Sequence, residues 1–108
     1  MDYKIIYTET AREDLMKIAL DLFELTGSRE CAAKYISGIQ TACDNLKAFP
    51  ACGTVPRDRV LMSMGYRFVQ YGDYLAFYLH DEKERLVTVM AVFNGKLDYP
   101  SYMKKYIR

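Results

Sequence analysis

The sequence predicts an α+β domain in which an N-terminal strand and an α-helical hairpin precede a three-stranded antiparallel meander. A short β-branched and aromatic segment opens the chain. Two segments with apolar residues at helical spacing follow it, and from residue 65 the apolar residues recur with a period of two. A lone strand would expose its backbone donors and acceptors, so we expect the first strand to join the C-terminal sheet. The helices are then expected to cover one face of that sheet in a two-layer sandwich.

The segment from Tyr3 to Tyr7 is typical of a strand, and a helix start follows it. Thr10 and Glu13 match a capping box, in which each side chain satisfies an amide at the helix N-terminus. Gly27 is predicted to end this helix, because glycine adopts the left-handed conformation at low cost. The residues expected to face the core are Ala11, Leu15, Ile18, Leu22 and Leu25.

A second helix is predicted to begin after Ser28, a suitable N-cap, and to end at Pro50. Almost no chain separates it from the first helix, so the two must fold back on each other as an αα-hairpin. Its expected buried residues are Ala32, Tyr35 or Ile36, Ile39, Cys43 and Leu46.

The second half reads as a loop at residues 51–58 and three strands at residues 65–71, 74–80 and 86–93. Gly72 and Asp73 are predicted to form a two-residue type II′ hairpin turn. The last strand is apolar almost throughout, which indicates that both of its faces are covered. The Pro-interrupted tail is expected to form only a terminal turn.

Length and composition narrow the class of protein. The 108 residues provide room for one domain, 1–108, and the net charge of +1 argues against a strongly basic nucleic-acid binder. The three cysteines are scattered and there is one histidine, so we expect reduced thiols and no zinc site or other metal centre. Neither a signal peptide nor an apolar run long enough to span a membrane is recognisable, so a cytoplasmic protein is expected.

Arg67 is the most informative single residue. It lies in the middle of a predicted strand, where a guanidinium offers a planar donor fork suited to phosphate or carboxylate. One interpretation is an anion or phosphate clamp. The other is an arginine on an open sheet face in a salt bridge, for instance with Asp98.

Other basic and aromatic residues flank the same sheet in the sequence. Arg57 and Arg59 precede it and Lys96 follows it, which makes them candidates for binding RNA phosphates or a protein target. Ordinary solvated surface is the alternative. His80 beside Asp81 is the only group with an unperturbed pKa near neutrality, but no nucleophile is near it in the sequence. With Arg57, Arg59 and Lys96, four tyrosines could form a basic and aromatic patch that binds single-stranded RNA. They are Tyr66, Tyr71, Tyr99 and Tyr102.

The chain resembles the RelE/ParE superfamily of toxins from bacterial type II toxin–antitoxin modules, also called plasmid-stabilisation proteins. The resemblance runs nearly end to end through YKIIYTETAREDLMKI, NLKAFPACG, GYRFVQYGDYLAFYLHDE and VMAVFNGKLDYPSYM. It implies a small curved sheet packed against a helical hairpin. It also implies a partner antitoxin that wraps and neutralises the toxin in a hetero-oligomer. Nothing in the sequence suggests a metal or organic cofactor.

The family divides by mechanism. RelE-like members cleave mRNA on the ribosome, whereas ParE-like members poison DNA gyrase and need no catalytic set. In the RelE-like interpretation, Arg67 corresponds to the arginine that acts on the scissile phosphate. Lys96 would be the basic residue after the last strand, and Tyr102 or Tyr99 the C-terminal tyrosine.

The sequence departs from the nuclease pattern before and after the sheet. Lysines are common where this chain has Val60, Leu61 and Met62, and a second basic residue is common where it has Leu97. The leading hypothesis is therefore a toxin that binds gyrase through the helical hairpin and the sheet edge. The alternatives are a metal-independent, ribosome-dependent mRNA endonuclease and a non-toxic protein-binding module.

Overall fold

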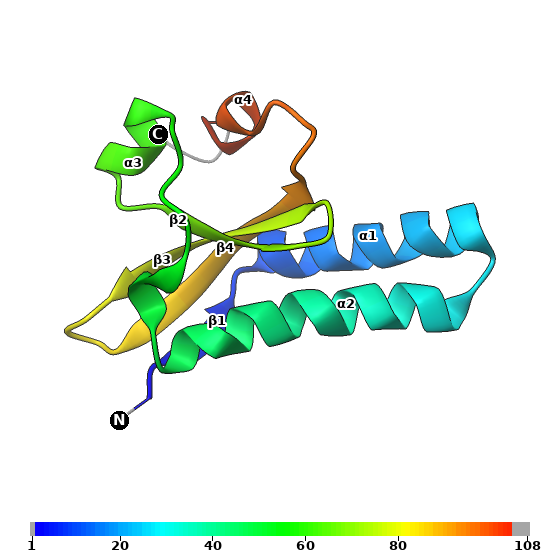
Figure 1. The fold of residues 1–108 in the computed structure, drawn as a ribbon, viewed down its shortest axis with the longest axis horizontal. Coiled ribbons are helices and arrows are strands. Elements are labelled where there is room, and N and C mark those ends of the chain that lie inside the picture. Colours follow the sequence, from blue (N-terminus) through cyan, green and yellow to red (C-terminus); the bar gives the residue numbers. More distant parts are fainter. Residues whose placement is uncertain (1, 105–108) are drawn as a thin grey trace.

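The computed structural model describes residues 2–104 and places a four-stranded sheet between helices (Figure 1). The strand order is β1-β4-β3-β2, with β1 parallel to β4 and the other neighbours antiparallel. This confirms the predicted α+β class and shows that the first strand joins the meander at β4. The strands are β1 (Lys4–Tyr7), β2 (Arg67–Tyr71), β3 (Tyr74–Asp81) and β4 (Leu86–Asn94). The helices are α1 (Glu9–Thr26), α2 (Arg29–Asp44), α3 (Arg59–Ser63) and α4 (Tyr99–Lys104).

The helix α1 begins two residues earlier than the sequence predicts. Its N-cap is Thr8, whose side chain accepts a hydrogen bond from the amide of Ala11, and the predicted cap Thr10 lies inside the helix. Thr8 holds this position because it also follows β1 directly. Its amide donates to the carbonyl of Val89 and its hydroxyl to that of Met90, at 3.1 Å each. One residue therefore ends the strand pairing and starts the helix.

The two long helices form the predicted hairpin. Gly27 takes the left-handed conformation (φ 68°) at the end of α1, and Ser28 caps α2 by accepting from the amide of Cys31. Leu25 was predicted to be buried but is 82% exposed. The hairpin extends past the sheet at this end, so no strand lies there to cover it (Figure 1).

α2 ends at Asp44 rather than at the predicted Pro50. The chain tightens there into a short 3-10 turn, η1 (Asn45–Lys47), and Pro50 instead begins a second turn, η2 (Pro50–Cys52). The amide of Tyr3 donates to the carbonyl of Lys47, so the turn is tied to the start of the chain. Leu46 becomes fully buried in this turn.

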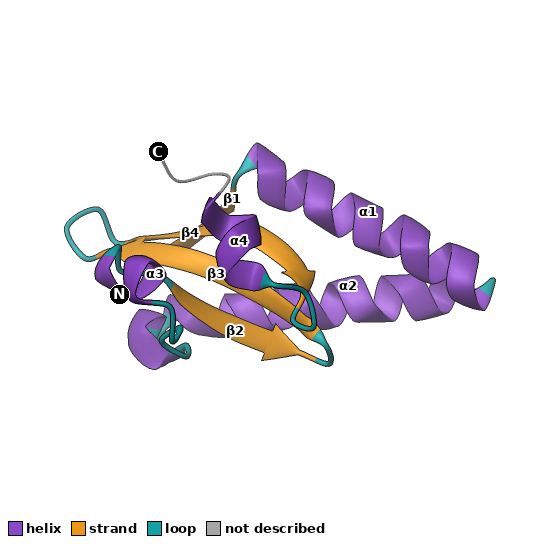
Figure 2. Cartoon of the chain, turned by 90° about the horizontal axis from the view of Figure 1, so that it is seen from above, coloured by secondary structure: helices purple, strands orange, loops and turns teal. Residues whose placement is uncertain are grey.

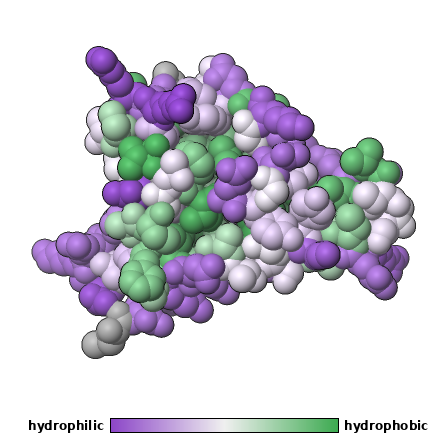
Figure 3. Space-filling model, in the orientation of Figure 1, coloured by the Kyte–Doolittle hydropathy of each residue, from purple (hydrophilic) through white to green (hydrophobic). Residues whose placement is uncertain are grey.

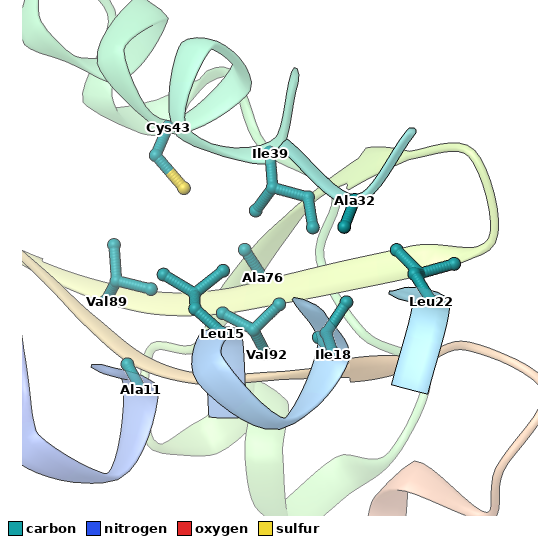
Figure 4. Packing of buried hydrophobic residues seen from close by; sticks show 10 residues of the cluster. All are labelled: Ala11, Leu15, Ile18, Leu22, Ala32, Ile39, Cys43, Ala76, Val89 and Val92. Carbon is teal, nitrogen blue, oxygen red and sulfur yellow. The ribbon is translucent and has the colours of Figure 1, made fainter. Parts of the chain in front are cut away.

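The core between the hairpin and the sheet is apolar. In Figure 4 the side chains of α2 point toward those of α1 and of the strands. Burial raises the pKa of the Cys43 thiol to about 11, so this cysteine is a protonated core residue. The buried members of the cluster are Ala11, Leu15, Ile18, Leu22, Ala32, Ile39, Cys43, Ala76, Val89 and Val92.

The second face of the sheet is covered as well, which agrees with the apolar character of the last strand but was not part of the predicted two-layer architecture. α3 and α4 lie on the side opposite the hairpin (Figures 1 and 2). The sequence predicts a loop before β2 and only a terminal turn after β4. Instead, Asp58 caps α3 through the amides of Val60 and Leu61, and α4 is tied down by Met103, which is 1% exposed. The buried members of this second cluster are Leu61, Tyr66, Leu75, Phe77, Ala91, Phe93 and Met103.

No helix within residues 2–104 is long and apolar enough to cross a membrane. Among the same residues, no group of three or more histidine, cysteine, aspartate or glutamate side chains is placed to hold a metal ion.

The turn η2 provides a test of the fold. Replacing Gly53 by alanine would bring Cβ into overlap with the buried hydroxyl of Tyr78 and to 2.9 Å from the carbonyl oxygen of Phe68. We expect Gly53→Ala to lower the free energy of unfolding by about 1–3 kcal/mol, measured by urea denaturation. Tyr78→Phe removes the hydroxyl and should by itself cost about 1–3 kcal/mol, because it leaves backbone groups of the turn unpaired. The double variant should lose less than the sum of the two, and strict additivity would contradict this account.

Candidate functional site

Arg67 opens β2 opposite Tyr78 of β3. Alternation along the strand places it on the same face as Val69, which packs against the hairpin core, so it does not lie on an open face. Its guanidinium donates to the carbonyl of Gly53 at 3.1 Å. Among the described residues no ion pair joins it to Asp98, whose carboxylate accepts from Ser101 instead. The arginine is half-buried and holds a backbone turn.

Tyr78 of β3 also binds the turn η2. Its hydroxyl donates to the carbonyl of Pro50 at 2.5 Å and accepts from the amide of Gly53 at 3.0 Å. Burial of the side chain raises the pKa of this phenol, so it stays protonated and can act as the donor at neutral pH. Arg67 and Tyr78 together therefore fix η2 against the sheet. No sequence pattern predicts this network, because its members are separated by 14 to 28 positions.

The other predicted site residues lie elsewhere. Lys96 follows β4, and its ammonium is 3.7 Å from the carboxylate of Asp73 at the β2–β3 turn, where both side chains are well exposed. The ring of Tyr99 packs against Phe68 and Phe77 on the face covered by α4. The structure does not bring Lys96 or Tyr99 to the guanidinium of Arg67, which belongs to the opposite face.

Tyr102 contacts a residue that the sequence analysis did not single out. Its hydroxyl donates to one carboxylate oxygen of Asp14 at 3.2 Å, and the other oxygen accepts from the amide of Val92 at 2.9 Å. β1 ends at Tyr7, opposite Val89, and does not extend to Val92. The carboxylate of Asp14 therefore accepts the hydrogen bond that the amide of Val92 cannot donate to β1. Burial raises the pKa of Asp14, although both hydrogen bonds oppose the shift. A cavity of about 210 Å³ lies beside this contact.

Arg57 and Arg59 flank Asp58, the N-cap of α3. Both are exposed, and α3 packs through Leu61 on the face that Arg67 does not share. They therefore form a surface of their own at α3.

His80 is not oriented by its neighbour. The carboxylate of Asp81 accepts from the amides of Lys83 and Glu84 and so closes the β3–β4 turn. The Nδ1 atom of His80 is buried and has no hydrogen-bond partner among the described residues. Nothing in this arrangement equips the imidazole for proton transfer.

The helical hairpin carries an exposed apolar stripe that is not among the predicted site residues. Met16, Leu20 and Phe23 lie at spacings of four and three on the outside of α1 and are 68%, 57% and 40% exposed. Phe23 also borders a groove of about 400 Å³ between α1 and α2. The signal was present in the sequence, because these residues repeat at helical spacing beside the buried face. The apolar residues that line the groove are Ala19, Phe23, Ala32, Ala33 and Ile36.

Comparisons with known proteins identify the family and the fold. A family model for the ParE toxin of the type II toxin–antitoxin system, parDE, matches residues 5–99. The RelBE2 toxin–antitoxin complex of Mycobacterium tuberculosis is similar in structure, with a TM-score of 0.63 and 21% identity over 87% of this chain and 99% of that chain. A chromosomal ParDE system of P. aeruginosa gives a TM-score of 0.68 and 18% identity over 85% and 95%. No curated protein sequence matches the chain.

The contact between Asp14 and Tyr102 predicts a pH dependence of stability. Because the pKa of Asp14 is raised on folding, the folded chain binds this proton more tightly than the unfolded chain. The ionised carboxylate therefore costs stability, and that cost grows as pH rises from the ordinary value near 3.8 through the folded pKa. The unfolding free energy of the wild type minus that of Asp14→Asn should therefore fall as pH rises above about 4.

Chemical denaturation at several pH values measures this difference. Tyr102→Phe is the companion variant, because it keeps the carboxylate and removes the hydroxyl whose hydrogen bond lowers the pKa of Asp14, so its loss of stability relative to the wild type should grow as pH rises. A difference for Asp14→Asn that stays constant or rises with pH would contradict the assignment.

Proposed function

The chain belongs to the ParE toxin family of type II toxin–antitoxin systems, and from this premise we propose that it stops growth by binding DNA gyrase rather than by cleaving mRNA. A cognate antitoxin binds and neutralises it in a hetero-oligomer. The toxin acts in the cytoplasm, where its target is.

The arrangement around Arg67 is the observation that carries the choice of target. A ribonuclease needs a phosphate-binding group, a base for the 2′-hydroxyl and a proton donor within reach of one phosphate. Here the guanidinium donates to the carbonyl of Gly53 and lies on the face opposite Tyr99 and Tyr102. Lys96 is occupied with Asp73 at the far turn. The set does not converge, which favours a toxin that acts by binding.

The exposed stripe of Met16, Leu20 and Phe23 supports a protein target. Apolar side chains at helical spacing on a solvated face are typical of protein-binding surfaces. The adjoining groove between α1 and α2 continues that surface. A large protein such as gyrase can cover both, whereas Met16 and Leu20 offer RNA no ring on which a base can stack.

The antitoxin partner rests on the similar structures, both of which come from toxin–antitoxin systems. By analogy with them, we expect the product of a neighbouring gene to bind this chain. Induction of the chain alone should arrest growth, and co-expression of the neighbouring gene should restore it. Unimpaired growth on induction would overturn the toxin function itself.

Substitution of Arg67 separates the two mechanisms. If the chain poisons gyrase, Arg67→Ala should retain inhibition of supercoiling to within about threefold, which corresponds to a loss below 1 kcal/mol. Tyr78→Phe is the matched control, because it loosens the same turn and leaves the guanidinium in place. Gyrase supercoiling assays and ribosome-dependent mRNA cleavage are measured on both variants. Cleavage by the wild type that is lost in Arg67→Ala but kept in Tyr78→Phe would establish the nuclease instead.

Substitutions in the hairpin stripe test where the target binds. Met16→Glu together with Leu20→Glu places two charges in the stripe and should weaken gyrase inhibition at least tenfold, as removal of an interface anchor does. Leu25→Glu is the control, because Leu25 is exposed on the same helix but outside the stripe. Equal inhibition by the double variant and the wild type would exclude the hairpin as the target surface.

A further inference from the structure

A second exposed apolar surface lies on the other side of the sheet, around α3. Four large apolar side chains within ten residues are exposed there, between 42% and 48% each. Single exposed apolar residues are ordinary, but four in one short segment are unusual for a solvated turn. They are Val55, Val60, Met62 and Met64.

The side of α3 that faces the sheet is already packed, so these four residues are not part of the core. Leu61 is fully buried against the sheet, and Pro56 before the helix is buried as well. Helical spacing places Val60 and Met64 on one flank and Met62 on the other. In the space-filling view, green hydrophobic residues lie at the upper left, where Figure 1 shows α3, beside purple hydrophilic ones (Figure 3).

This surface is also cationic. Arg57 and Arg59 are exposed, and neither forms an ion pair with any residue between 2 and 104. The only acidic residue in the segment is Asp58, whose carboxylate accepts from the amides of Val60 and Leu61 as the helix cap. Residues 55–64 thus carry two arginines against one aspartate, and neither guanidinium is held in an ion pair within the part of the chain that the structure describes.

The composition of the surface favours a protein segment over RNA. Single-stranded RNA is held by cations together with aromatic rings on which bases stack, and residues 55–64 contain no aromatic residue. Methionine and valine offer adaptable apolar contacts instead. The complementary ligand carries carboxylates for the two arginines and aliphatic side chains for the flanks of the helix.

We propose that an acidic, amphipathic segment of the antitoxin docks on this α3 surface, defined by Val55, Arg57, Arg59, Val60, Met62 and Met64. Its carboxylates pair with the two arginines and its apolar side chains cover the flanks of α3. The identity of the partner rests on the proposed function. The chemistry of the surface does not.

A binding assay with designed peptides tests the chemistry. The probe is a fluorescein-labelled peptide of about 15 residues with leucines at helical spacing and glutamates beside them. Matched probes are the same peptide with lysine for glutamate, and an oligouridine of about 12 nucleotides. The acidic peptide should bind the wild-type chain, with an affinity that falls as salt is added, and more tightly than either matched probe.

Substitutions in the chain locate the contact. Arg57→Glu with Arg59→Glu should weaken binding of the acidic peptide at least tenfold and should favour the lysine peptide instead. Met62→Ser with Met64→Ser should also weaken it without any change in charge. Arg12→Glu with Lys34→Glu changes the net charge by the same amount on exposed positions of the hairpin and should leave binding within about twofold.

Three outcomes would overturn the proposal. They are no binding of the acidic peptide to the wild type, an equal loss in the hairpin control, and tighter binding of the RNA probe. Circular dichroism on each variant excludes unfolding as the cause of a loss. Growth arrest by the wild-type chain is a separate measurement, so failure of the toxin function and failure of the α3 surface are seen independently.

Discussion

A β-bulge in β4 adds one residue relative to β3, and the packing of side chains on both faces of the sheet depends on this bulge. The register steps from Phe77 paired with Ala91 to Tyr78 paired with Val89, so Met90 lies opposite no residue of β3. A strand without this bulge would place every second residue on one face throughout its length. With it, Val89 and Val92 both reach the hairpin core, while Ala91 belongs to the second core. The same bulged residue offers its carbonyl to Thr8, which starts α1.

The sequence predicted the parts of the fold that depend on local periodicity. The two long helices and the three meander strands each repeat an apolar pattern, and the caps Gly27 and Ser28 depend on chemistry within one turn. α3 was missed because Val60, Leu61 and Met62 are consecutive apolar residues and show no period over five positions. The choice of Thr8 over Thr10 was also inaccessible, since it depends on contacts with β4 more than 80 positions away.

The candidate site was less predictable, because its contacts connect distant segments. Arg67 is recognisable in the sequence as an unusual strand residue, but its partner is a backbone carbonyl, which leaves no trace in residue type. Asp14 meets Tyr102 across 88 positions and looks like any solvated aspartate on α1. The exposed stripe of Met16, Leu20 and Phe23 is the exception. Its helical spacing is visible in the sequence. The sequence does not show which face of α1 packs on the sheet, however, so a second apolar stripe cannot be distinguished from the core.

The two exposed apolar surfaces lie on opposite sides of the sheet, and this constrains how a partner can neutralise the toxin. A target on the hairpin leaves α3 uncovered, so an antitoxin bound at α3 alone would not displace it. The molecule measures 43 × 33 × 21 Å, and an extended chain advances about 3.3 Å per residue. A segment of about ten residues therefore spans the 33 Å dimension. If the target binds the hairpin as proposed, an antitoxin that anchors at α3 and continues around the sheet edge could reach the same stripe and would compete with the target for it.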